Sequence, residues 1–136
     1  MDIDRVRQFV TQHHRAVLAT RTQDGGIQQS PVLVVVDDEG RFVISSRETA
    51  YKVKNLQRDP WAQVCVFTDK FFGSWYYLEG QASVVTLPDA MGPLEDYYRA
   101  AVGEHDDWPA YRAAMEKERR VVIRIDAQRA GPDHAG

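Results

Sequence analysis

Two turn signals in the first forty residues constrain the fold of this chain most strongly. Residues 23–26 read Gln-Asp-Gly-Gly and residues 37–40 read Asp-Asp-Glu-Gly, with strand-like stretches on both sides of each. Asp-Gly sequences are typical of tight hairpin turns because Gly readily adopts the positive φ that such turns need. We therefore expect the first part of the chain to form antiparallel strands joined by short turns.

The hydrophobic pattern extends this arrangement along the rest of the chain. Strands are expected over residues 16–21, 27–36, 42–46, 62–68, 75–86 and 121–125. Gly80 interrupts the fifth strand and predicts a bulge or a bend. Helices are expected over residues 2–14, from the N-cap Thr49 to just before Pro60, over residues 88–102 and over residues 107–117.

Antiparallel strands with one apolar face predict a small barrel, because closure removes exposed sheet edges. The fold class is therefore mainly β (α+β), a six-stranded antiparallel barrel with flanking helices. Six strands enclose too little space for a large ligand. A large cofactor is accordingly expected outside the barrel, in a groove completed by a second subunit. Residues 1–130 are expected to form a single domain, followed by a frayed tail over residues 131–136.

Composition and charge argue against several classes of protein. The formal net charge of −3 disfavours a nucleic-acid binder. The single cysteine, Cys65, excludes an intramolecular disulfide and is expected to be a buried, inert thiol. No apolar run approaches the roughly 18 residues of a membrane span. The acidic N-terminus does not resemble a signal peptide, so a cytoplasmic location is expected.

Three cations gather where the second helix is expected to start. Arg47, Lys52 and Lys54 follow closely after the hydroxyl residues Ser45 and Ser46. A helix N-terminus carries partial positive charge, so cations are favoured there only with an anion between them. The pattern is compatible with a phosphate site, and also with a solvated helix that carries ordinary surface lysines.

Residues 71–77 are dense in aromatic side chains and open the fifth strand. Alternation places Trp75 and Tyr77 on one face of that strand and Tyr76 on the other. Such a strand packs between two layers, lies at an interface, or stacks on a planar heterocycle, and the sequence leaves these alternatives open.

No arrangement of residues identifies catalytic or metal-binding groups. His13, His14, His105 and His134 are expected to be surface residues rather than ligands. No Ser/His/Asp set is recognisable, and no metal is expected. This is consistent with an enzyme whose cofactor carries the chemistry, although absence alone does not establish one.

Several segments together resemble a known family. They are Val-Leu-Ala-Thr at 17–20, Asp-Gly at 24–25 with Gln-Ser-Pro-Val at 29–32, Lys-Val-Lys-Asn-Leu-Gln-Arg-Asp-Pro at 52–60, Leu-Glu-Gly-Gln-Ala at 78–82, residues 103–115 and Arg-Arg-Val at 119–121. Their order resembles the pyridoxamine 5′-phosphate oxidase-like split β-barrel superfamily. Within it, the chain is most similar to the F420-dependent flavin/deazaflavin oxidoreductases of the B group, common in actinobacteria.

The resemblance implies a homodimer with two cofactor sites at the subunit interface. It implies coenzyme F420 as the cofactor, with FMN as the alternative. The strand around Ser30, Pro31 and Val32 would line the deazaflavin ring, and Trp75 or Tyr77 would reach the site from the other subunit. The remaining implied cofactor-binding residues are Ser45, Ser46, Arg47, Lys52, Lys54 and Asn55.

The implied reaction is hydride transfer from reduced F420 to an electron-poor organic acceptor. Three other functions stay open: an FMN-binding enzyme of the pyridoxamine-phosphate oxidase type, a non-catalytic F420 carrier, and a haem-binding split barrel, which the lack of a well-placed His disfavours. The sequence names neither the substrate nor a proton donor.

Overall fold

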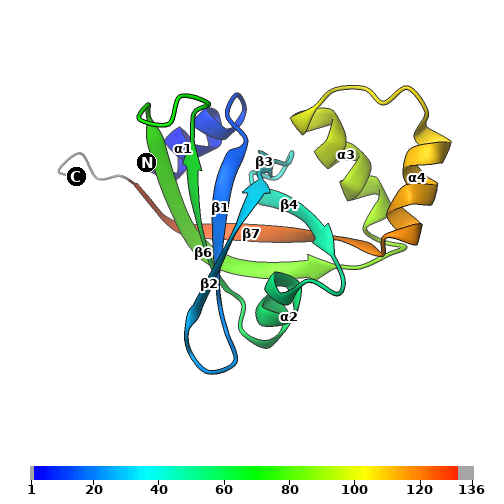
Figure 1. Ribbon diagram of the computed structural model, residues 1–136. Coiled ribbons are helices and arrows are strands. Elements are labelled where there is room, and N and C mark those ends of the chain that lie inside the picture. The colour runs from blue at the N-terminus through cyan, green and yellow to red at the C-terminus, as the bar shows by residue number, and fades with distance from the viewer. Residues whose placement is uncertain (1, 132–136) are drawn as a thin grey trace.

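Seven strands form one antiparallel sheet that curls into a split barrel (Figure 1). The computed structural model describes residues 2–131. The elements are α1 (Asp2–Val10), β1 (Arg15–Arg21), β2 (Ile27–Leu33), β3 (Val35–Val36), β4 (Phe42–Arg47), α2 (Tyr51–Arg58), β5 (Trp61–Phe67), β6 (Trp75–Val85), α3 (Met91–Ala101), α4 (Trp108–Lys117) and β7 (Arg120–Gly131). The strand order is β2-β1-β5-β6-β7-β4-β3.

The expected strand over residues 27–36 is divided at Val34, and this division closes the barrel. β2 pairs with β1 at one end of the strand order, whereas β3 pairs with β4 at the other end. Only Val34 separates β2 from β3, and its N–H donates to the carbonyl of His14 at 2.9 Å. One continuous segment therefore joins both ends of the sheet. The expected antiparallel barrel is confirmed, with its second strand counted as two.

Apolar side chains fill the interior of the barrel. α1 and α2 lie at its opposite ends (Figure 1) and contribute Val6, Val10, Val53 and Leu56 to the core, each at most 3% exposed. The strands add alternate residues such as Leu18, which is 1% exposed. A packed interior leaves no space for a large ligand, as the strand number predicted.

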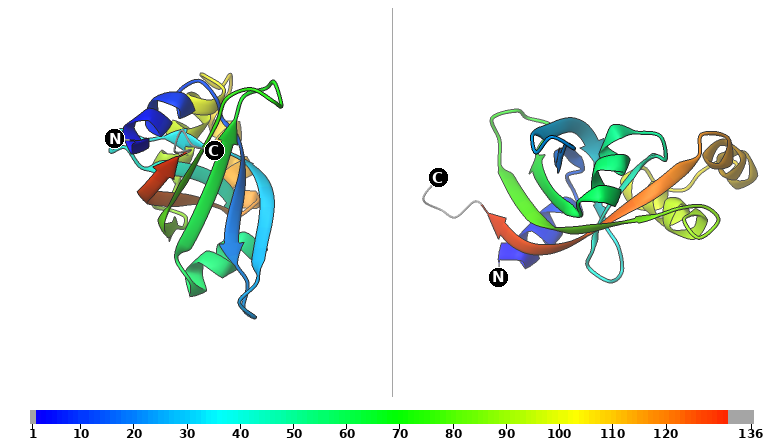
Figure 2. Two further views of the ribbon diagram at one scale, coloured as in Figure 1. Left: turned by 90° about the vertical axis from the view of Figure 1, so that its left-hand side faces the viewer. Right: turned by 90° about the horizontal axis from the view of Figure 1, so that it is seen from below.

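A second core lies outside the barrel. The helices α3 and α4 pack side by side beyond the end of β6 and the start of β7 (Figure 2). Val35, Val43 and Val122 face outward from β3, β4 and β7 and pack with Leu94 of α3 and Tyr111 of α4. The α3–α4 pair thus covers one part of the outer sheet face.

Gly80 marks a bulge, as its position predicted. The register between β6 and β7 shifts between Glu79 and Gly80. A Cβ at residue 80 would lie 2.0 Å from the carbonyl oxygen of Asp126, so the backbones approach too closely for any side chain.

Four expected boundaries are wrong. α3 starts at Met91 rather than at residue 88, because residues 87–90 form a turn. α1 ends at Val10 rather than at residue 14. Thr49 does not cap α2, whose N-cap is Ala50 and has no side-chain cap bond. β7 continues to Gly131 rather than stopping at residue 125, because the long strand β6 supplies partners up to the pair Tyr77–Gly131. The rest of the expected tail, residues 132–136, lies outside the described residues.

Candidate functional site

The split in the barrel brings two groups of predicted site residues together. β3 and β4 pair only at Val35–Val43 and Val36–Phe42. Beyond these pairs, β2 and β4 contact each other without forming a ladder. Continuing the register would place Leu33 opposite Ser45. The facing edges of β2 and β4 therefore present backbone groups without sheet partners, which are available to a ligand.

Tyr97 of α3 occupies the point where the ladder between these strands ends. Its hydroxyl donates to the carbonyl of Leu33 at 2.8 Å, and the backbone of Ser45 lies near the same hydroxyl. Burial raises the pKa of Tyr97 to about 12, although the Ser45 contact and the nearby Arg120 act in the opposite direction. The Tyr97 side chain thus lies where the next backbone pair of the β3–β4 ladder would form. The sequence analysis did not identify this residue.

The three predicted residues of β2 do not share one face. Ser30 pairs with the core residue Leu18, so its side chain points into the barrel, whereas Pro31 is exposed on the outer face. Ser30 Oγ is buried and has no hydrogen-bond partner among the described residues. The Ser30 hydroxyl therefore lies inside the barrel, and only the backbone of this part of β2 faces the open edge.

A shallow cavity of about 440 Å³ lies next to this part of β2. Pro31, Val32, Leu33 and Phe67 provide most of its lining, which is mainly apolar. Two of the residues predicted to line a deazaflavin ring, Pro31 and Val32, therefore border a space suited to a flat, largely apolar group.

The predicted residues of β4 and α2 meet at the other end of the split. Ser46 is buried, Ser45 is half-buried, and Arg47 is exposed and forms an ion pair with Glu118 at 3.4 Å. Lys52 is half-buried and forms no ion pair with any residue of the described range 2–131. Burial lowers the pKa of Lys52, and the charge of Arg120 lowers it further.

Arg120 is the cation that the sequence analysis missed at this position. It pairs with Arg47 across the β4–β7 ladder and holds Glu118 at 2.9 Å. Helix α2 has no acidic residue in its first turn and no side-chain cap. Two close cations beside uncapped amides form an environment that an anion stabilises. The segment Arg119-Arg120-Val121 carried part of the family resemblance and was the signal that could have identified Arg120.

Lys54 and Asn55 lie differently from the rest of this group. Lys54 is exposed. Asn55 is 7% exposed, and its amide nitrogen donates to Thr20 Oγ1 at 3.1 Å and to Gln28 Oε1 at 3.0 Å. Its amide oxygen accepts from Arg58 at 3.0 Å. These contacts make Asn55 a link between α2 and the barrel wall.

Trp75 and Tyr77 lie on the outer face of the sheet, and Tyr76 packs against the barrel core, as alternation predicted. Cross-strand pairs place Pro31, Val17, Cys65 and Tyr77 in one row across four strands. Leu33, Phe67 and Trp75 extend this row into an apolar surface, which we call the outer face.

Cys65 is therefore half-buried in the outer face rather than in the core, because β5 alternates and its inward positions are Val64 and Val66. Burial still raises the pKa of the Cys65 thiol, which disfavours the reactive thiolate.

The described histidines are half-buried rather than on the surface, and each has a contact inside the fold. His13 stacks on Phe9, His14 Nδ1 lies 2.9 Å from the carbonyl of Val34, and His105 packs against Tyr98. His134 lies outside the described residues. Within residues 2–131, no three His, Cys, Asp or Glu side chains are placed to share a metal ion. In the same range, no helix is both long and apolar enough to span a membrane.

These features define a class: small split β-barrels with a cationic, uncapped helix start beside the split. The chain belongs to the pyridoxamine 5′-phosphate oxidase family, whose family model matches residues 3–132.

Solved structures share this fold at low sequence identity. A conserved hypothetical protein from Mycobacterium tuberculosis superposes with a TM-score of 0.77 at 23% identity, over 96% of this chain and 82% of that chain. An F420 reductase gives a TM-score of 0.71 at 19% identity, over 92% of this chain and 94% of that chain. A heme binding protein from Mycobacterium smegmatis gives a TM-score of 0.71 at 19% identity, over 96% of this chain and 52% of that chain. At these identities the likeness establishes the common fold.

Proposed function

We propose that this protein is an F420-dependent oxidoreductase that works as a homodimer and reduces an electron-poor organic molecule. One observation carries the proposal: the half-buried Lys52 lies beside Arg120 without an ion-pair partner in residues 2–131. Arg120 is paired with Glu118, whereas Lys52 has no counter-charge of its own in that range, and a bound phosphate or carboxylate would supply one.

The residues around the split fit such a cofactor. Lys52 and Arg120 are placed to hold its phosphate, and the uncapped start of α2 offers backbone N–H groups to the same anion. The open edge of β2 provides backbone polar groups for the rim of a ring system. The apolar cavity beside Pro31 and Val32 suits the ring itself.

The outer face supports the proposed homodimer. Trp75 is 46% exposed and Leu33 is 43% exposed, and both border the row from Pro31 to Tyr77. Large apolar side chains gathered on one face favour burial against another protein surface. A second copy of the chain would cover this face and bring its aromatic residues towards the edge of β2.

When bound in reduced form, F420 supplies the hydride. The role of this chain is to hold the cofactor by its anionic part, to fix the orientation of its ring and to keep the acceptor close. Orientation of this kind contributes roughly 7–11 kcal/mol in favourable cases.

The first experiment is a binding titration of the purified protein with F420 and, separately, with FMN. Quenching of tryptophan fluorescence reports binding, with Trp61, Trp75 and Trp108 as the fluorophores. We expect tight binding of F420 and weaker binding of FMN. The Lys52→Ala variant should bind F420 roughly tenfold or more weakly, whereas Lys70→Ala, which removes an exposed loop lysine, should bind like the parent.

The other outcomes separate the alternatives. A preference for FMN would move the protein to flavin chemistry in the same fold. Tight F420 binding without oxidation of reduced F420 by any acceptor would indicate a carrier. Unchanged F420 binding by Lys52→Ala would contradict the anion site, and binding of neither cofactor would overturn the proposal.

A further inference from the structure

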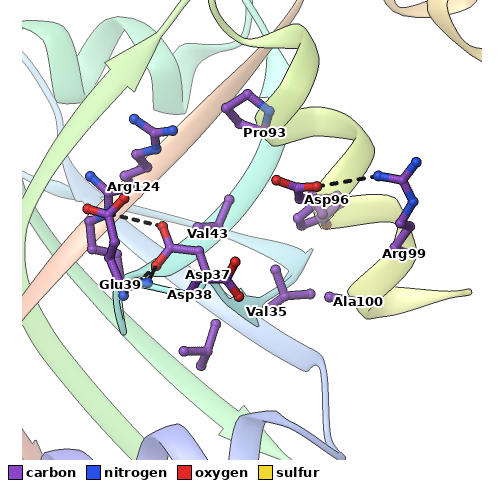
Figure 3. A pocket seen from close by; sticks show the side chains of 13 residues that line it. Val35, Asp37, Asp38, Glu39, Val43, Pro93, Asp96, Arg99, Ala100 and Arg124 are labelled. Carbon is purple, nitrogen blue, oxygen red and sulfur yellow. Dashed lines mark hydrogen bonds and ion pairs between the residues drawn. The ribbon is translucent and has the colours of Figure 1, made fainter.

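A separate cavity of about 420 Å³ lies between α3 and the turn that connects β3 to β4 (Figure 3). Residues 37–39 of the turn and Arg124 of β7 form one side of it, and Pro93, Asp96 and Arg99 of α3 form the opposite side (Figure 3). This volume is within the range of sites for small organic molecules.

Arg124 is the unusual group in this cavity. Its backbone pairs with Val43 on one side and with Ser83 on the other, so the side chain leaves the middle of the sheet. The residue is half-buried, and its Nε is buried with no hydrogen-bond partner among residues 2–131. Arg124 also forms no ion pair with any residue between 2 and 131. The Arg124 side chain lines the cavity without a counter-charge from residues 2–131, and a ligand carboxylate would supply one to its guanidinium group.

The other two arginines of the cavity already have partners. Arg41 binds Asp37 at 3.0 Å and Glu39 at 3.1 Å. Arg99 binds Asp96 at 3.4 Å and stacks on Trp108 at 4.3 Å. Asp37 also accepts bonds from two backbone N–H groups of its own turn, which keeps it away from Arg124. Arg124 is therefore the cation that remains available to a ligand.

The charge balance of the lining decides which kind of ligand fits. Four carboxylates line the cavity (Asp37, Asp38, Glu39 and Asp96) against three guanidinium groups (Arg41, Arg99 and Arg124). A simple organic anion would be attracted by Arg124 and repelled by this excess of acids. Asp38 is exposed at the rim and has no ion pair in the described range, so it is free to receive an ammonium group. Val35, Val43 and Ala100 supply apolar lining.

We infer that this cavity binds a small zwitterion with an apolar body, whose carboxylate contacts Arg124 and whose ammonium group faces Asp38. The inference rests on Arg124 and its surroundings and is independent of the proposed cofactor and reaction. The bidentate geometry of a guanidinium with a carboxylate gives such a site its orientation.

The test is calorimetric titration of the full chain with three related probes. L-phenylalanine carries both charges and an apolar body, 3-phenylpropanoate lacks the ammonium group, and 2-phenylethylamine lacks the carboxylate. We expect L-phenylalanine to bind best. The ¹⁵N-detected Nε–H signal of Arg124 should shift on binding, which locates the ligand.

Matched variants complete the test. Arg124→Gln should weaken binding of L-phenylalanine at least roughly tenfold. Asp38→Asn should weaken binding of L-phenylalanine and should not weaken binding of 3-phenylpropanoate, because the change removes a carboxylate that repels this probe. Arg5→Gln, a change on the exposed side of α1, should bind like the parent. Should Arg124→Gln fail to fold, Arg124→Lys keeps the charge, lacks the planar fork and should still bind more weakly. Equal binding by the Arg124 variants, equal binding of all three probes, or no binding of any probe would overturn the inference.

Discussion

Tyr97→Phe removes only the hydroxyl that occupies the end of the β3–β4 ladder. In the variant, the carbonyl of Leu33 loses a donor at 2.8 Å. Removing a hydrogen bond at this exposed position costs about 0.5–1.5 kcal/mol. For a chain of this length, that loss lowers Tm by roughly 2–6 °C. Urea unfolding at pH 7, followed by circular dichroism, measures the difference directly.

The pH dependence of this difference provides a second readout. The pKa of Tyr97 is raised to about 12 in the folded protein, against about 10 in the unfolded chain. The resulting stabilisation is fully present below pH 10 and is lost as pH rises from 10 to 12, for a total of about 2–3 kcal/mol. The parent should therefore lose its advantage over Tyr97→Phe across this window. The pKa of Tyr111 is also raised to about 12, by burial and in part by the charge of Tyr97, so the comparison is repeated with Tyr111→Phe in both proteins.

The matched control is Tyr51→Phe, because the Tyr51 side chain is 73% exposed. It should unfold like the parent at both pH values. A Tyr97→Phe protein as stable as the parent at pH 7, or a stability difference that stays constant from pH 10 to pH 12, would refute the role given to this hydroxyl.

Three further substitutions test other parts of the structure. Gly80→Ala should destabilise the fold by roughly 1–3 kcal/mol or more, because the new Cβ would meet the Asp126 backbone. Thermal unfolding measures this loss. The control Gly92→Ala has open space around the new Cβ and should be as stable as the parent. Asn55→Ala should lower the free energy of unfolding by about 1–3 kcal/mol, because Thr20 and Gln28 lose their shared donor. Its F420 affinity, measured by fluorescence titration, should equal that of the parent. A loss of affinity at unchanged stability would instead show that Asn55 contacts the cofactor. Trp75→Lys places a charge in the proposed dimer interface and should shift the protein towards monomer in sedimentation equilibrium, whereas Ala113→Lys on α4 should not; an unchanged mass would exclude the outer face as the interface.

Local patterns were sufficient to predict most of the elements. The Asp-Gly turns, the alternation in β6 and the interruption at Gly80 each reflect the conformation of a few neighbouring residues. Boundaries were predicted less well, because they depend on partners elsewhere in the chain. β7 extends to Gly131 because β6 offers a pairing edge, and the first turn of α2 lacks the Thr49 cap that its sequence suggested.

The candidate site divides in the same way. Lys52 could be proposed from the sequence because cations at a helix start are unusual on local grounds. Arg120 could not be proposed on the same grounds, since it approaches Lys52 only when β7 pairs with β4. Tyr97 and Arg124 are likewise ordinary in sequence and become notable through what surrounds them.

The sequence by itself determined a small antiparallel barrel with a cationic helix start and a two-sided aromatic strand, because turn chemistry and periodicity are properties of adjacent residues. Only the tertiary structure decided that the second strand breaks at Val34 and leaves a split, and that Tyr97 lies at the end of this split. It alone decided that Ser30 and Arg124 have buried polar atoms without partners in the described part of the chain. These features depend on which segments meet across the sheet. Contacts of that kind are fixed by packing over the whole chain and have no local signal.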